Sequence, residues 1–71
     1  MAYIACVKTE ELGLIYLCDE GMKSTYTKAF ADRWSSRRLA ADAARFYAKE
    51  CNRAARELGW PEDAVPQVMV V

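Results

Sequence analysis

The side chains that most often do chemistry in proteins are few in this sequence. It contains no histidine, which excludes Ser–His and Cys–His catalytic pairs. The three cysteines, Cys6, Cys18 and Cys51, match no zinc-binding spacing and cannot all pair with one another within one chain. We therefore expect buried, reduced thiols with a structural role, and a reducing compartment.

Acidic and glycine residues give no further sign of a reaction centre. The adjacent acids Asp19–Glu20 and Glu62–Asp63 fall in segments that resemble loops, where carboxylates are usually solvated. A phosphate-binding loop needs closely spaced glycines, and the three glycines of this chain are far apart. We therefore predict that the protein is not an enzyme, and that it uses no cofactor, metal or small molecule.

A basic segment is the first candidate for a binding site. The stretch RRLAADAARFYAKECNRAAR runs from Arg37 to Arg56. At about 100° per residue, a helix made from it collects basic side chains on one face and alanines on the opposite face. The candidate partner-binding residues of this basic face are Arg38, Arg45, Lys49, Arg53 and Arg56.

Three interpretations of the basic face stay open at this point. It fits a solvated surface with ion pairs to acids one turn away, a contact for an acidic protein surface, or a contact for a phosphate backbone. The chain has ten basic and ten acidic residues, so its formal net charge is zero and no overall basic field attracts nucleic acid. We therefore favour a protein partner over nucleic acid.

The strands that would accompany this helix are short and apolar. The segments AYIACVK (2–8) and LIYLC (14–18) are β-prone and are separated by charged residues and Gly13, which suits a hairpin. A third, short strand is expected at Arg33–Trp34. The segment QVMVV (67–71) follows a proline and reads as the closing strand.

The helix has clear signals at both ends. Ser35 or Ser36 is the expected N-cap, and Gly59, Trp60 and Pro61 form a stop signal, so the helix should span about 36–58. The predicted fold class is α+β, with a small antiparallel sheet of three to four strands in ββ(β)αβ order packed on one long helix. We expect a single domain over residues 1–71.

The predicted sheet is apolar on both faces, although one helix covers only one of them. We expect the uncovered face to form an interface with a protein partner or with a second copy of the chain. Its candidate residues are Tyr3, Val7, Leu14, Tyr16 and Met69. The alternative is that the segment TYTKAFADRW, which ends at Trp34, folds over this face.

The stretch AFADRWSSRRLAADAARFYAKEC carries a resemblance to a known group of proteins. With Ala31, Trp34, Ser35 and the alanines from Ala40, it resembles small ββαβ proteins encoded by phages and prophages. The resemblance implies a protein that binds and blocks or redirects a host protein, such as a defence nuclease or the transcription machinery. It carries over no functional residue.

These observations together predict a small binding protein rather than a catalyst. We expect it to act by surface contact on a host protein, as an inhibitor of a defence or regulatory complex, with a nucleic-acid accessory protein and a homodimer as alternatives. No apolar stretch approaches the about 20 residues of a membrane-spanning helix, and the start MAYIACVK lacks the features of a signal peptide. We therefore expect a cytoplasmic protein with no membrane contact.

Overall fold

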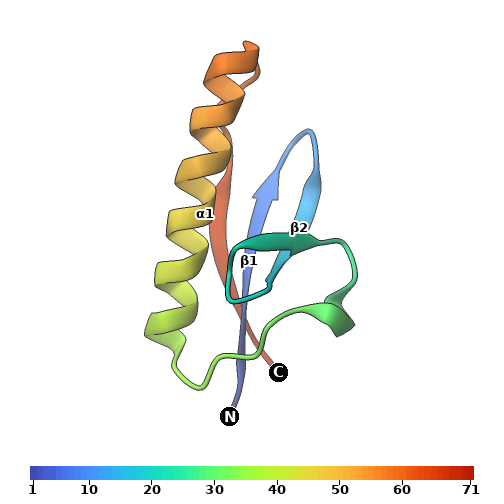
Figure 1. The fold of residues 1–71 in the computed structure, drawn as a ribbon, viewed down its shortest axis with the longest axis vertical. Coiled ribbons are helices and arrows are strands. Elements are labelled where there is room, and N and C mark those ends of the chain that lie inside the picture. The colour runs from blue at the N-terminus through green and yellow to red at the C-terminus, as the bar shows by residue number, and fades with distance from the viewer.

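The computed structural model describes all of residues 1–71, and it contains one antiparallel sheet and one long helix (Figure 1). The predicted α+β class is therefore confirmed. The sheet has four strands in the order β3-β2-β1-β4. The elements in chain order are β1 (Tyr3–Thr9), β2 (Gly13–Cys18), β3 (Lys23–Thr25), the short 3₁₀ helix η1 (Lys28–Phe30), α1 (Arg37–Leu58) and β4 (Val65–Val70).

Both ends of α1 follow from local sequence signals. The Ser36 side chain accepts a hydrogen bond from the backbone N–H of Leu39 at 3.3 Å, which satisfies one of the free donors of the first turn. At the other end, Gly59 has φ of 73°, the left-handed conformation that glycine adopts without strain. The backbone N–H of Trp60 donates to the carbonyl of Ala55 at 2.8 Å, which completes a Schellman motif.

A row of alanines packs α1 against the sheet. Ala40, Ala44 and Ala48 lie one turn apart and are almost fully buried. They join a core with strand residues that point toward the helix, namely Ala5, Val7, Ile15 and Leu17. Because alanine has the smallest side chain with a β carbon, this row lets the helix axis come close to the strands.

The strand pairing decides which side chains share a face of the sheet. Val7 lies opposite Ile15, so both side chains point toward α1, whereas Cys6 lies opposite Tyr16 on the outer face. The grouping of Tyr3, Val7, Leu14, Tyr16 and Met69 on one face is therefore wrong. Tyr3 and Val7 belong to the helix side, and the other three lie on the outer face.

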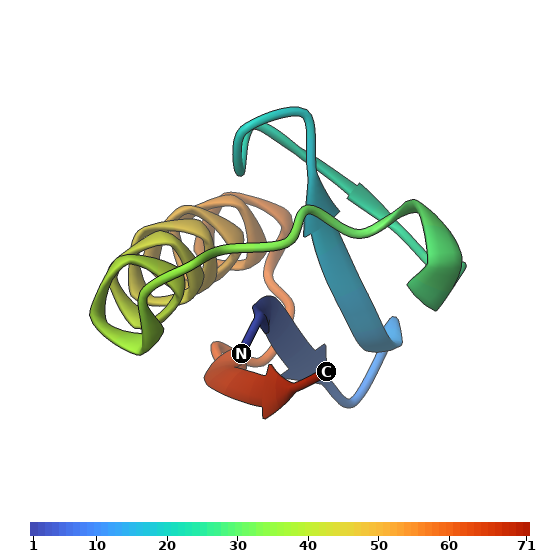
Figure 2. The ribbon, with the colours of Figure 1, turned by 90° about the horizontal axis from the view of Figure 1, so that it is seen from below.

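The outer face is only partly open. Ile4 and Cys6 point away from the helix-side core and are nevertheless buried. Figure 2 shows η1 on the opposite side of the sheet from α1, which places the segment around Lys28 over part of this face. Phe30, however, is 71% exposed and does not cover the sheet.

The third strand lies earlier in the chain than expected. β3 is formed by Lys23–Thr25, whereas Trp34 makes only an isolated bridge with Tyr3. The turn that leads into β3 has three consecutive residues in the left-handed region, Asp19, Glu20 and Gly21. A β carbon at Gly21 would lie 3.6 Å from the Ala43 Cβ atom, so this turn rests directly on α1.

The alanine row generates a prediction about stability. Replacing Ala44 with leucine inserts three carbons where the helix contacts the sheet, so we expect the free energy of unfolding to fall by about 1–3 kcal/mol. Urea unfolding followed by circular dichroism measures the change. The matched control is Ala54→Leu, at an exposed alanine of the same helix, where we expect a change within about 0.5 kcal/mol. Equal effects of the two substitutions would contradict the close packing at Ala44.

Candidate functional site

Helix α1 is longer than the strand on which it lies. Its 22 residues span about 33 Å, whereas the 7 residues of β1 span about 23 Å. The guanidinium of Arg37, at the start of α1, lies over the ring of Tyr3, at the start of β1. The excess length is therefore found at the C-terminal end, where α1 extends past the hairpin (Figure 1).

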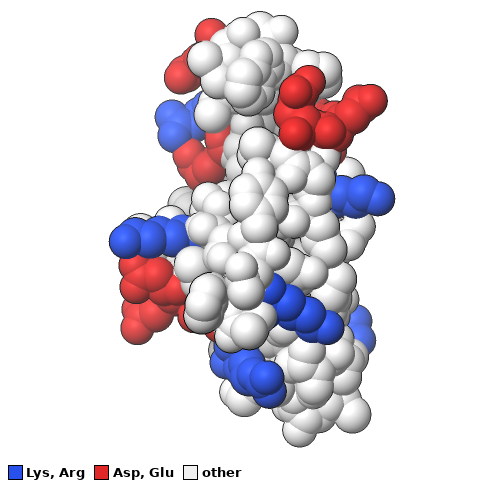
Figure 3. Space-filling model, turned by 90° about the vertical axis from the view of Figure 1, so that its right-hand side faces the viewer, with Lys and Arg blue, Asp and Glu red and all other residues white.

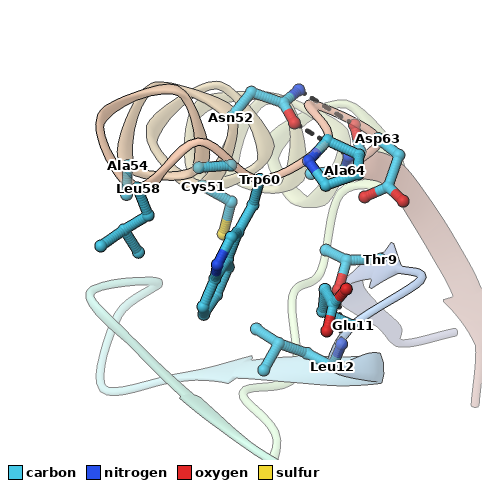
Figure 4. Close-up of a pocket in the computed structure, with 12 residues that line it drawn as sticks. Thr9, Glu11, Leu12, Cys51, Asn52, Ala54, Leu58, Trp60, Asp63 and Ala64 are labelled. Atoms are coloured by element: carbon cyan, nitrogen blue, oxygen red, sulfur yellow. Dashed lines mark hydrogen bonds between the residues drawn. The ribbon is translucent and has the colours of Figure 1, made fainter.

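A hollow of about 140 Å³ lies beneath this extended end of the helix (Figure 4). Its floor is the helix surface at Cys51 and Ala54, and the side chains of Leu58, Trp60 and Leu12 form its walls. Leu12 comes from the turn between β1 and β2, so the hollow lies between this turn and the α1–β4 connection that carries Trp60. The side chains that enclose it are mainly apolar.

Several hydrogen bonds hold these walls in place. The Schellman motif fixes the backbone of Trp60, and the Leu12 N–H donates to the hydroxyl of Thr9 at 2.8 Å. The Asn52 side chain accepts from the Ala64 N–H at 2.9 Å and donates to the Ala64 carbonyl at 3.3 Å. The hollow is therefore formed before any partner arrives, which lowers the entropic cost of binding.

A second hollow, of about 300 Å³, continues along the same flank of α1. It shares Cys51 and Ala54 with the first and is extended by Phe46 from the helix and Met22 from the β2–β3 turn. We call the continuous depression the apolar groove. Its exposed large apolar residues are Leu12, Met22, Phe46, Leu58 and Trp60, with exposed fractions between 44% and 74%.

The charged side chains along the apolar groove are all acidic. Glu11 and Asp63 line the first hollow, Glu50 lines the second, and no lysine or arginine lines either. Burial raises the pKa of the Cys51 thiol, and the nearby Glu50 raises it further. The thiol therefore stays protonated at neutral pH and behaves as part of the apolar floor.

The basic face of α1 is largely neutralised by ion pairs. Of the five residues predicted for it, Arg45 pairs with Asp42, and Arg53 pairs with Glu50. Arg56 pairs with Glu62 at 2.7 Å. The remaining two, Arg38 and Lys49, form no ion pair. The five residues do share the helix, but only two of them present an uncompensated charge.

The structure separates the residues predicted for the sheet face. Val7 is fully buried beneath α1 and has no surface to offer a partner. Tyr3 is half-buried on the helix side, 5.4 Å from the Arg37 guanidinium. Leu14 and Tyr16 in β2 and Met69 in β4 share the outer face and are half-buried, with β1 between the two strands. Figure 3 shows uncharged surface along the middle of this side of the molecule, with both acidic and basic side chains around it.

The sequence alone did not identify the residues of the apolar groove. Phe46 lies beside the apolar arc of the helix, a position that favours packing in the core, yet it is 64% exposed. Trp60 is part of the predicted stop signal, and its backbone N–H donates to the Ala55 carbonyl. Its place in a groove depends on the distant Leu12, for which the sequence gives no local signal.

The structure shows neither a metal-binding cluster nor a membrane-spanning helix. No group of three or more histidine, cysteine, aspartate or glutamate side chains is arranged to hold a metal ion. No helix combines the length and apolar character needed to cross a bilayer. Burial raises the pKa of the Cys6 thiol, so this group is also a poor nucleophile.

The Arg56–Glu62 pair gives a prediction for pH titration. The hydrogen bond from Arg56 holds the pKa of the Glu62 carboxyl below its usual range. The interaction is therefore present above the usual glutamate pKa and is lost as the pH falls through the lowered value. In an NMR titration we expect Arg56→Gln to return the Glu62 midpoint to the usual range. Arg45→Gln, which removes a different pair, should leave it unchanged, and an unshifted midpoint in the wild type would contradict the pairing.

Comparisons with protein-family models, with curated proteins and with solved structures found no match for this chain.

Proposed function

We propose that the protein acts without catalysis, by binding another protein through the apolar groove. The observation that carries this proposal is the exposure of five large apolar side chains around one preformed depression. Contiguous apolar surface of this kind on a small protein marks an interaction site, because its exposure to water is unfavourable at about 25 cal/mol per Å². Trp60 and Phe46 are the types of residue that contribute most at interfaces.

The chemistry of the groove favours one kind of partner segment. A groove beside a helix accommodates the apolar face of a second, amphipathic helix. The acidic residues Glu11 and Asp63, which form no ion pair, favour lysine or arginine next to the apolar anchors of that partner. The proposed occupant is therefore an amphipathic helical segment with basic residues at the edges of its apolar face.

The biological setting is part of the same proposal. The three free cysteines support a reducing compartment such as the cytoplasm. The resemblance of the sequence to small phage and prophage proteins supports a role in blocking a host defence or regulatory complex. Nucleic acid has less support as a partner, because three of the five basic-face residues are already paired with carboxylates.

The proposal predicts selective binding of a designed peptide. The probe is an 18-residue amphipathic helix of leucine and lysine, and its counterpart has glutamate in place of lysine. In a Trp34→Phe background, Trp60 reports directly on the groove, since these are the only two tryptophans. We expect saturable binding of the lysine peptide with a blue shift of Trp60 emission, and much weaker binding of the glutamate peptide.

Substitutions in the apolar groove test whether the lysine peptide binds there. Phe46→Ser and Leu58→Ser each remove an exposed groove side chain, so we expect about tenfold weaker binding with little change in stability. Leu39→Ser is the matched control, because Leu39 is 53% exposed on the same helix and lines neither hollow. Equal losses in all three variants, or a stable dimer abolished by Leu58→Ser in sedimentation, would argue against a heterologous partner in the groove.

A further inference from the structure

Strand β4 leaves one edge of the sheet without a partner. The order β3-β2-β1-β4 places it at the margin, and Val65–Val70 reads VPQVMV, with no charged residue. Natural edge strands are usually protected by charges, bulges or a covering element, because free backbone N–H and C=O groups recruit further strands. β4 also contacts α1, so its free edge lies beside the helix.

The pairing pattern shows which backbone groups face the free edge. Tyr3 exchanges both of its backbone hydrogen bonds with Trp34, at 2.9 and 2.8 Å, so it has none left for its neighbour Val70 in β4. Hydrogen-bonded and non-hydrogen-bonded pairs alternate along an antiparallel ladder. Val68 and Val70 therefore direct their N–H and C=O groups outward.

Pro66 fits the same alternation. It lies two residues before Val68, so its backbone nitrogen also faces the free edge. Because a proline nitrogen carries no N–H, no hydrogen bond between β4 and β1 is lost there. Val71 belongs to the other set of alternating residues, whose backbone groups point toward the N-terminal strand. Its N–H accordingly donates to the Ala2 carbonyl at 2.9 Å. Along the free edge, Pro66, Val68 and Val70 thus offer three backbone carbonyl acceptors, and Val68 and Val70 offer two N–H donors.

Basic side chains of α1 flank this edge. A hollow of about 240 Å³ between the helix and β4 is lined by Pro66, Gln67 and Val68, and its only charged residues are Arg37 and Arg45. An adjoining hollow that also reaches Pro66 contains Lys49, and its two acids, Glu50 and Glu62, are paired with Arg53 and Arg56. Arg37 and Lys49 form no ion pair with a carboxylate. The charge beside the edge is therefore positive, opposite to that of the apolar groove.

We propose that the free edge of β4 binds an extended acidic segment of a partner protein by strand addition. The backbone of that segment pairs with Val68 and Val70, and its carboxylates lie against Arg37 and Lys49, which no carboxylate of this chain neutralises. This site is separate from the apolar groove, which follows the other flank of α1. A second copy of the chain is a poorer fit, because a β4–β4 pair would bring the basic flanks of both copies, each with the unpaired Arg37 and Lys49, together across the twofold axis.

The test uses an eight-residue peptide of alternating threonine and glutamate, with a threonine–lysine peptide for comparison. Binding is followed by amide NMR and hydrogen exchange of the full chain. We expect the glutamate peptide to bind and to slow exchange at the amides of Val68 and Val70, and the lysine peptide to bind at least about tenfold more weakly.

Backbone variants separate strand addition from simple charge attraction. Val68→Pro removes an outward N–H without touching the bonds to β1, so we expect about tenfold weaker binding with the fold retained. Val68→Ala keeps the N–H and should bind like the wild type. If Val68→Pro does not fold, Val70→Pro makes the same test nearer the chain end.

Three results would overturn the proposal. One is wild-type affinity in the folded proline variant, and another is equal binding of the two peptides. The third is a dimer in sedimentation whose Val68 and Val70 amides are already protected without peptide, since a second copy would then occupy the edge.

Discussion

The close approach of α1 to the sheet through Ala40, Ala44 and Ala48 is the constraint on which the other surfaces depend. These three side chains fill the contact with very little volume, so the helix lies near β1 and β4. The larger apolar side chains of Phe46 and Leu58 lie outside this contact and are exposed.

The same constraint leaves a small core. Only 10 of the 71 residues are buried, and the largest fully buried side chains are Ile4, Leu17, Val7 and Cys6. A chain of this length buries a modest share of its surface, so its stability depends on each of these contacts. An apolar groove on such a protein exposes surface that a larger core could have absorbed, which is consistent with selection for binding rather than for stability.

The parts of the fold that could be predicted are those encoded locally. The cap at Ser36 and the stop at Gly59 and Trp60 depend on residues within one turn of the helix, so its limits were correct. The face assignments of the strands were not correct, because they depend on the register between chain segments. A shift of one residue moves every side chain of a strand to the other face, and the apolar residues on both faces gave no sign of the true register.

The candidate site could not be predicted for a related reason. The groove exists because α1 is longer than β1 and because Trp60 meets Leu12, about 50 residues earlier in the chain. The periodicity of apolar residues in the sequence shows neither how far α1 extends past β1 nor that Trp60 and Leu12 line the same hollow. The basic face could be recognised in the sequence, but part of its charge is neutralised by Glu62, which follows the end of α1 and pairs with Arg56.

One side chain connects the two proposed surfaces. Asn52 lines the apolar groove on one flank of α1 and the hollow near Lys49 on the other. Its two hydrogen bonds hold Ala64, the residue directly before β4. The position of the groove wall and the start of the edge strand therefore share one anchor. Because the surfaces carry opposite charge on opposite flanks, they suit two different segments that the protein could hold at the same time, one basic and one acidic.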